Sequence, residues 1–364
     1  MEVLEMTVFN DIYRNKSVLL TGHTGFKGSW LALWLKTLGA NVTGLALDPD
    51  STTSHWDMLD LNIVDKRIDI RDAKKVNETI KVTKPEVVFH LAAQPLVRRS
   101  YLEPVNTWST NVMGTVNLLE ACRQQPSIRA IVVITTDKCY ENNEWVWGYR
   151  EIDRLGGHDP YSASKASSEL VVASYRKAFF NMTDSPLIAS VRAGNVIGGG
   201  DWSQDRLIPD LVRAIKAQDT LEIRSPNATR PWQHVLESLS GYLSLGQKLL
   251  QGERDFAEAW NFGPNHEGNK TVVDVLLRIK EEWPIADWEI TKSPQPHEAN
   301  LLYLDSSKAH QKLNWNPVWS IDESIKETVY WYKSLIERSE VVSRIQLEKY
   351  IDKAILNGFD WCCS

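Results

Sequence analysis

Apolar residues in the first half of the chain alternate between short continuous runs and longer stretches with helical spacing. The continuous runs predict buried strands at 17–20, 41–47, 67–70, 87–91, 130–135 and 187–192. Stretches in which apolar side chains recur every three or four residues predict helices at 26–38, 72–81, 106–123 and 162–180. Asp72 is placed to cap the second of these helices.

This alternation predicts an α/β fold with a doubly wound parallel sheet. A helix between two strands favours a right-handed crossover and a sheet covered on both faces. The nearly continuous apolar character of the strands agrees, because such strands are buried on both faces. Ligands bind beyond the carboxyl ends of such strands, near the switch in strand order. We therefore expect one crevice to be surrounded by the loops after Leu20, Leu47, Leu91 and Thr135.

The pattern becomes less regular after residue 190, in a region richer in Pro and Trp. Helical spacing continues at 208–217, 236–250, 271–282 and 321–338. We therefore expect a sheet domain over 1–190, with returns to the sheet near 231–262. Most of 191–340 is expected to form a smaller substrate-binding lobe. The last part, 341–364, is expected to be a loosely attached tail helix.

Composition and charge exclude several classes of protein. The net charge of −6 disfavours nucleic acid as a partner, because phosphate binding usually needs a basic face. The four cysteines lack metal-ligand spacing and are too few for a disulfide framework, so we expect no metal site and a cytoplasmic location. We also expect no membrane partner, because there is no signal-peptide pattern and no run of about 18 apolar residues.

A glycine-rich segment, TGHTGFKG, follows the first predicted strand and opens the first predicted helix. Its GxxGxxG spacing allows a tight turn and a close approach of the backbone to a pyrophosphate. The helix N-terminus supplies free N–H groups for the phosphates. A plain glycine-rich turn is the alternative, but the position between strand and helix favours a dinucleotide site. The expected cofactor-binding residues here are Gly22, Thr24, Gly25, Phe26, Lys27 and Gly28.

Asp48 ends the second strand and favours NAD over NADP as the cofactor. A carboxylate there accepts hydrogen bonds from the adenine ribose and repels a 2′-phosphate. The alternative is a simple turn residue in the sequence Asp-Pro-Asp at 48–50. Asp69 and Ile70 end the third predicted strand and are expected beside the adenine. Residues that let a backbone pass near the cofactor follow the fourth strand, namely Leu91, Ala92 and Ala93.

Tyr161 and Lys165 form a YxxxK pair at the start of the helix predicted at 162–180. Residues four apart lie on the same face of a helix. A neighbouring ammonium favours a tyrosinate, so we expect Lys165 to lower the pKa of Tyr161 and make it a base. Lys165 is also placed to hold the nicotinamide ribose. The alternative is a solvated helix face, but the glycine-rich loop favours a catalytic pair.

Residues 135–138 leave the end of the fifth predicted strand, at the expected crevice. Thr136 is placed to polarise a substrate hydroxyl together with Tyr161. Asp137 is expected to act as an acid, and Lys138 to support proton removal. For Asp137 and Lys138, the alternative is an exposed turn pair.

These motifs together resemble the extended short-chain dehydrogenase/reductases that act on sugar nucleotides, a family with a Rossmann fold. Within that family the resemblance is strongest to the branch of 4,6-dehydratases that acts on CDP-glucose. No single motif is specific, but together they cover most of residues 16–310. The resembling segments are TGHTGFKGSW (21–30), HLAAQPLV (90–97), TNVMGT (110–115), DKCY (137–140), WVWGYR (145–150), RAGNVIGGGDW (192–202), DRLIP (205–209) and RPWQHV (230–235).

The resemblance implies an internal redox cycle with NAD. The sugar is oxidised at C4, loses water across C5 and C6, and is reduced at C6. Asp137 is implied as the acid that protonates the leaving hydroxyl. Many 4,6-dehydratases carry Asp-Glu after the threonine, whereas this chain has Lys138 at the second position. A neutral Lys138 could be the base at C5, or it could only stabilise the enolate, and both roles stay open.

The resemblance also implies the residues around the substrate. Arginine forks match phosphate oxygens in two places, which favours arginines beside the diphosphate of CDP-glucose. The expected substrate-binding residues are Gln94, Asn195, Arg206, Leu207, Ile208, Arg230 and His297. Further cofactor-binding residues that the resembling segments imply are Asn111, Thr135 and Arg192.

Two other functions compete with this prediction. A sugar-nucleotide 4-epimerase shares the fold and the Tyr–Lys pair but needs no acid for dehydration, so residues 136–138 argue against it. A non-catalytic NAD-sensing protein would be expected to lose Tyr161 or Lys165, and both are present. The resemblance further implies a homodimer or a dimer of dimers, built from the helices at 106–123 and 162–180.

Overall fold

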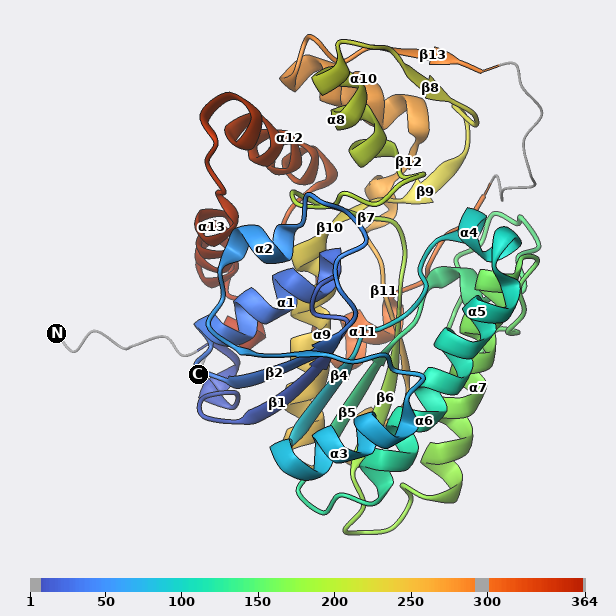
Figure 1. Cartoon of the computed structure of the whole chain (residues 1–364). Helices are drawn as coiled ribbons and strands as arrows, with labels where there is room; N and C mark the ends of the chain where they lie inside the picture. The colour runs from blue at the N-terminus through green and yellow to red at the C-terminus, as the bar shows by residue number, and fades with distance from the viewer. Residues whose placement is uncertain (1–7, 292–300, 363–364) are drawn as a thin grey trace, which may run out of the picture.

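A single parallel sheet of seven strands runs through the centre of the molecule (Figure 1). The computed structural model describes residues 8–291 and 301–362. Every neighbouring pair of strands in this sheet is parallel. The strand order is β11 (Ala259–Phe262), β6 (Leu187–Ala193), β5 (Ala130–Ile134), β4 (Val87–His90), β1 (Ser17–Thr21), β2 (Asn41–Ala46) and β3 (Val64–Arg67). This order confirms the predicted doubly wound sheet and places the switch point between β1 and β4.

Helices cover both faces of the sheet, because successive strand residues point to opposite sides. Val18 and Leu20 face the larger apolar core, where α1 (Phe26–Thr37) and α9 (Val235–Leu250) pack. Leu19 faces the second core, formed with α3 (Ala73–Thr83), α6 (Gly114–Arg123) and α7 (Pro160–Ala178). The continuous apolar strands are therefore buried on both faces, as predicted.

The predicted strand at 67–70 is wrong in position. The pairing of β3 with β2 ends at Arg67. Asp69 then turns the chain, because its side chain accepts a hydrogen bond from the backbone N–H of Arg71 at 2.8 Å. The predicted helix at 106–123 is confirmed as α5 (Pro104–Trp108), a π-helical turn (Ser109–Met113) and α6 in succession.

A second group of elements lies above the carboxyl ends of the strands (Figure 1). It contains two small two-stranded sheets, and its elements are α8 (Leu207–Ala217), β8 (Leu221–Ile223), β9 (Thr229–Pro231), β12 (Asn269–Thr271), α10 (Val272–Glu282) and β13 (Trp288–Ile290). Between β9 and β12 the chain returns to the main sheet as α9 and β11. Shorter elements are α2 (His55–Leu59), α4 (Val97–Leu102), α11 (Ser307–Lys312), β7 (Val196–Ile197) and β10 (Gln233–His234).

Residues 341–362 are packed against the core, so the prediction of a loosely attached tail helix is wrong. Helix α12 (Ile321–Arg338) packs against α10, and α13 (Ser343–Leu356) lies beside α1 (Figure 1). The fully buried Tyr350 of α13 donates a hydrogen bond to the Glu237 carboxylate of α9 at 2.7 Å. That carboxylate also accepts the backbone N–H groups of Val318 and Trp319. Among the described residues, no helix is long and apolar enough to cross a bilayer.

Candidate active site

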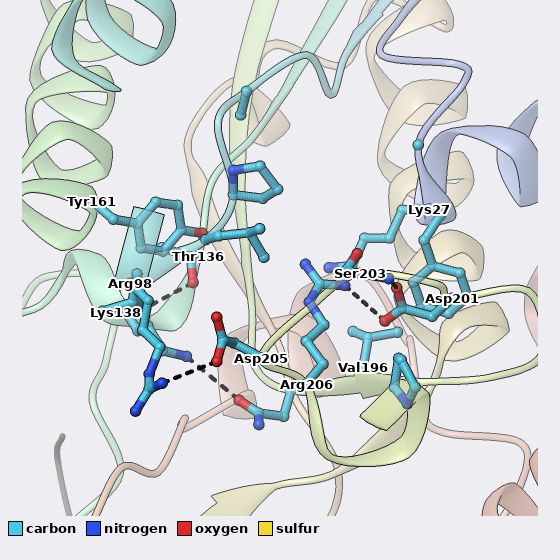
Figure 2. A pocket seen from close by; sticks show the side chains of 18 of the residues that line it. Lys27, Arg98, Thr136, Lys138, Tyr161, Val196, Asp201, Ser203, Asp205 and Arg206 are labelled. Atoms are coloured by element: carbon cyan, nitrogen blue, oxygen red, sulfur yellow. Dashed lines mark hydrogen bonds and ion pairs between the residues drawn. The ribbon is translucent and has the colours of Figure 1, made fainter. Parts of the chain in front are cut away.

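One large cavity, of about 1190 Å³, opens at the carboxyl ends of the strands. The loops that follow β1, β2, β4 and β5 line it on the sheet side, as the alternation of strands and helices predicted. Residues of β7, α8, β8 and β9 line it on the other side. Figure 2 shows side chains from both sides converging on this cavity. The cavity therefore lies where ligands bind in doubly wound folds.

The glycine-rich segment borders the cavity and is shaped by two very close backbone contacts. Gly22 has a φ of +75°, and a Cβ there would lie 2.7 Å from the backbone nitrogen of Ala92. A Cβ on Gly28 would lie 2.0 Å from the carbonyl oxygen of Gly22. Gly25 precedes α1, and no side chain caps the first N–H groups of that helix. These free N–H groups at the cavity fit the diphosphate of a dinucleotide.

Most of the predicted cofactor-binding residues line this cavity. Asp48 extends its carboxylate at the exposed edge, where its side chain is 86% accessible. Its carboxylate lies 3.6 Å from the Arg67 guanidinium. The predicted cofactor residues that line the cavity are Gly22, Thr24, Gly25, Phe26, Lys27, Gly28, Asp48, Asp69, Ile70, Leu91, Ala92, Ala93, Thr135, Tyr161 and Lys165.

Asn111 and Gln94 do not line the cavity, which corrects their predicted contacts with cofactor and substrate. The Asn111 carboxamide accepts the backbone N–H of Gln94 at 2.8 Å and donates to the Ser164 hydroxyl at 2.8 Å. The Gln94 side chain donates to the Thr107 hydroxyl. Both side chains are buried and fully occupied in tying the loop after β4 to α5 and α7.

Arg192 is also absent from the cavity lining, so its predicted contact with the cofactor is wrong for this structure. Its guanidinium is buried against Glu169 at 2.9 Å and donates to the Tyr140 hydroxyl at 2.7 Å. Glu169 in turn accepts hydrogen bonds from the hydroxyls of Thr135 and Ser190. A buried charge needs such partners. Through Thr135, this network also holds the end of β5 in place.

Tyr161 lies in the first turn of α7, which Asp159 caps by accepting the backbone N–H of Ser162 at 2.9 Å. The phenol is buried at the cavity wall and shares a hydrogen bond with the Thr136 hydroxyl. Burial raises the pKa of Tyr161 to about 12, although the hydrogen bond to Thr136 opposes the shift. Burial thus acts against the fall in the pKa of Tyr161 that the neighbouring ammonium was expected to cause.

Lys165 lies one turn further along α7. Its ammonium donates to the carbonyl oxygen of Ile134 at 3.2 Å. Burial lowers the pKa of Lys165 to about 8, against the opposing charge of Glu169. Burial is thus the largest influence on the pKa of both members of the Tyr–Lys pair.

Asp137 lies behind the cavity wall, whereas Lys138 lines the cavity. The Asp137 carboxylate is fully buried and accepts the Thr136 hydroxyl at 2.9 Å. Its other oxygen has no hydrogen-bond partner among the described residues. The Lys138 ammonium lies 3.6 Å from Asp137 and donates to the Asn195 carboxamide oxygen at 3.4 Å. The exposed turn pair considered as an alternative is therefore excluded for Asp137.

On the opposite side, all but two of the predicted substrate residues line the cavity. The predicted substrate residues that line the cavity are Asn195, Arg206, Leu207, Ile208 and Arg230. Of the other two, Gln94 has been placed above, and His297 lies outside the described residues. Arg206 donates to the Asp201 carboxylate at 2.9 Å, and Arg230 is buried.

Several charged residues of the cavity were not predicted from the sequence. Asp205 binds Arg98 at 3.2 Å and Arg224 at 3.0 Å, so it joins the loop region after β4 to the second group of elements. Asp201, which was also not predicted, faces Arg206 in the same cavity, as does the predicted cofactor residue Lys27 (Figure 2). The quoted motifs contain or adjoin these positions, but sequence alone does not pair them. Among the described residues, no group of three or more side chains could hold a metal ion.

Known proteins resemble this chain over most of its length. The family model for GDP-mannose 4,6 dehydratase matches residues 19–328. The chain is 48% identical to the CDP-glucose 4,6-dehydratase of Salmonella typhimurium, over 94% of this chain and 98% of that protein.

Solved structures establish the fold. An epimerase from Methanothermobacter thermautotrophicus has a TM-score of 0.80 at 23% identity, with 95% of this chain and 99% of that chain covered. A dTDP-glucose 4,6-dehydratase from Streptomyces venezuelae, solved with NAD bound, has a TM-score of 0.74 at 24% identity, with 87% and 97% covered. With the family model and the Salmonella relative, these matches show that the chain belongs to the GDP-mannose 4,6-dehydratase family of extended short-chain dehydrogenase/reductases.

Proposed function

We propose that this protein converts CDP-glucose to CDP-4-keto-6-deoxyglucose and water, as an NAD-dependent lyase. The observation that supports this most directly is that one cavity is lined both by the glycine-rich start of α1 and by Thr136, Lys138 and Tyr161. A dinucleotide and a sugar would therefore meet in the same space. The 48% identity to a CDP-glucose 4,6-dehydratase supports the choice of nucleotide.

The residues around the glycine-rich segment would hold NAD. The first turn of α1 would bind the diphosphate, Asp48 the adenine ribose, and Lys165 the nicotinamide ribose. When bound, NAD supplies a hydride acceptor for sugar C4 and a hydride donor for C6. The Asp48 carboxylate disfavours a 2′-phosphate and thus NADP.

Tyr161 would take the proton of the C4 hydroxyl during oxidation, with Thr136 holding the same oxygen. The resulting ketone makes the C5 proton acidic. Lys138 would either take that proton as the base or stabilise the enolate, since its ammonium lines the cavity beside Asn195. The C6 hydroxyl would then leave as water, and C5 regains a proton when C6 is reduced.

Asp137 would supply the proton for the departing C6 hydroxyl. Its carboxyl group is buried, but the Thr136 hydroxyl that it binds lines the cavity. A proton on Asp137 can therefore reach the cavity along that hydroxyl. An epimerase would need no such donor, and for this reason we favour the dehydratase.

Asn195, Arg206 and Arg230 would bind the nucleotide part of the substrate, with Leu207 and Ile208 beside them. Arginine forks pair with diphosphate oxygens in two places. The second group of elements, which carries these residues except Asn195, would thus be the substrate-binding lobe.

We also propose that the protein is a homodimer or a dimer of dimers. Apolar side chains of α5, the following π-helical turn and α7 face solvent, with Val105 81% and Leu170 60% exposed. Burying such side chains in a partner subunit would stabilise the assembly.

The decisive experiment is mass spectrometry of the purified protein with NAD and CDP-glucose, run beside dTDP-, UDP- and GDP-glucose. We expect CDP-glucose alone to lose the mass of one water molecule, without net reduction of NAD. Loss of water from another sugar nucleotide would keep the reaction but overturn the substrate. An isomer of unchanged mass would indicate an epimerase, and no product at all would indicate a sensor.

A further inference from the structure

Arg206 reaches into the cavity from the N-terminal end of α8. Its side chain is partly buried, and its guanidinium donates to the Asp201 carboxylate at 2.9 Å. Figure 2 shows the guanidinium in the space between Tyr161 and Lys27, and its charge acts on both side chains. Arg206 thus faces the tyrosine that is proposed to act as the base.

Asp201 holds Arg206 from a firmly anchored position. Its carboxylate is buried and also accepts the backbone N–H of Ser203 at 3.0 Å. Its carbonyl oxygen accepts the hydroxyl of Tyr332, in α12, at 2.6 Å. The loop's own backbone therefore holds the carboxylate that orients the guanidinium, and α12 holds the backbone of Asp201.

The charges around Tyr161 act in opposite directions. Asp137 and Asp159 disfavour an ionised phenol, whereas Arg206 favours it. Lys165 is turned toward the carbonyl of Ile134, and burial lowers its own pKa to about 8. The groups that act on Tyr161 from the surrounding elements are Thr136, Asp137, Asp159, Arg206 and Tyr242. Arginine keeps its charge at every working pH, which a buried lysine does not.

We propose that Arg206, held by Asp201, is a positioning residue that acts through Tyr161: its guanidinium stabilises the ionised phenol, which then takes the proton of the substrate hydroxyl and becomes neutral. This role rests on the proposed function of Tyr161 and is separate from holding phosphate. A charge on the substrate-binding side of the cavity would then determine how readily the catalytic base, Tyr161, ionises.

The test is the dependence of kcat/KM on pH. Replacing Arg206 with Gln removes the charge but keeps a hydrogen-bonding side chain. The limb of the profile that reports ionisation of Tyr161 should move to higher pH by about one unit. Arg206→Lys should move it less, because a positive charge remains. Arg213→Gln is the matched control, since Arg213 binds Asp210 in the same helix but does not line the cavity.

A double variant tests the part played by Asp201. If Asp201 acts through Arg206, adding Asp201→Ala to Arg206→Gln should leave the limb where Arg206→Gln places it. A further shift of the same size as that of Asp201→Ala alone would contradict this coupling. A raised KM with an unmoved limb in Arg206→Gln would overturn the proposal and leave Arg206 as a substrate ligand only.

A measurement without turnover separates this proposal from the proposed function. In protein labelled with ¹³C at tyrosine Cζ, the NMR signal lost in Tyr161→Phe identifies Tyr161. We expect this signal to begin titrating at lower pH in the wild type than in Arg206→Gln, whether or not any sugar nucleotide is converted. Identical titrations would overturn the role of Arg206. Absence of dehydration by the wild type would instead overturn the proposed function.

Discussion

Tyr161 illustrates how strongly burial controls the chemistry of one side chain. Its phenol is held by Thr136 at the cavity wall, and burial raises its pKa to about 12. Proton removal by Tyr161 therefore depends on nearby groups that stabilise the negative charge. The hydrogen bond shared with Thr136 and the charge of Arg206 both act in that direction.

Replacing Tyr161 with Phe should reduce turnover by at least about 100-fold, because general base catalysis is lost. NAD binding should survive, since Lys165 and the glycine-rich segment are unchanged. Steady-state kinetics and calorimetric titration with NAD measure the two effects. Tyr175→Phe is the control, because Tyr175 lies in the same helix and bonds Glu120 outside the cavity. Normal turnover in Tyr161→Phe would contradict its role.

Replacing Asp137 with Asn should slow the loss of water more than the oxidation at C4. Asn still accepts the Thr136 hydroxyl but cannot carry the proton for the leaving group. We expect the absorbance of the reduced nicotinamide to rise during turnover and kcat to fall by about 100-fold or more. Full activity with a flat absorbance would exclude Asp137 as the acid.

Site residues whose side chains take part in proton transfer could be predicted from the sequence. Tyr161, Thr136 and Lys138 carry such chemistry, and all three line the cavity. The roles of Asn111 and Arg192 could not be predicted correctly. The sequence does not show whether a polar side chain joins a buried hydrogen-bond network or binds a ligand. The structure shows their hydrogen bonds to be directed into the protein.

At the level of elements, Glu237 joins helix α9 to the last part of the chain. It is fully buried and accepts three hydrogen bonds, from Val318, Trp319 and Tyr350. Burial raises the pKa of Glu237 from 4.5 to about 7. Between these values the folded protein keeps a proton that the unfolded chain has lost. This group therefore lowers stability as pH rises through that window.

Glu237→Gln should remove this contribution. The free energy of unfolding of the wild type, relative to the variant, should decrease by up to about 3 kcal/mol between pH 4.5 and pH 7. Urea denaturation of both proteins at several pH values measures the difference. Curves that stay parallel over this range would contradict the pKa assigned to Glu237.

The alternation of strands and helices could be predicted because each long element repeats its own apolar period. Helix α1 and strand β2 are examples, and both begin at the predicted residue. The position of β3 could not be predicted from the sequence, because all its residues are exposed and its pattern is not apolar. Sequence also gave no sign that α13 is buried, since its contacts are with distant residues such as Glu237.

Across the described part of the molecule, three of the four buried histidines have strongly lowered pKa values, which makes stability depend on pH. His55 lies between Ser29 and Ser343, His90 contacts Thr21 and Thr115, and His234 lies at the start of α9. Burial lowers the pKa of each histidine to about 3. The unfolded chain binds protons below about pH 6.5 and the folded chain does not, so stability is lost as pH falls.

The wild type should therefore be less resistant to urea at about pH 5 than at about pH 7.5. Each histidine contributes up to about 1.4 kcal/mol per pH unit. His55→Gln keeps a polar partner for both serines and should make the loss visibly less steep. An unchanged slope in this variant would show that His55 is protonated in the folded protein.

The buried position of α13 has a consequence for how the protein is made. A ribosome delivers the chain from its N-terminus, so the sheet and its glycine-rich loop emerge first. The core around α1 and α9 is closed only when residues 343–356 arrive, since Leu347 and Tyr350 are buried in it. Until then the growing chain exposes Trp34 and its neighbours, which α13 later covers. The nascent protein would thus be prone to aggregate, and dependent on chaperones, until residues 343–356 have been synthesised.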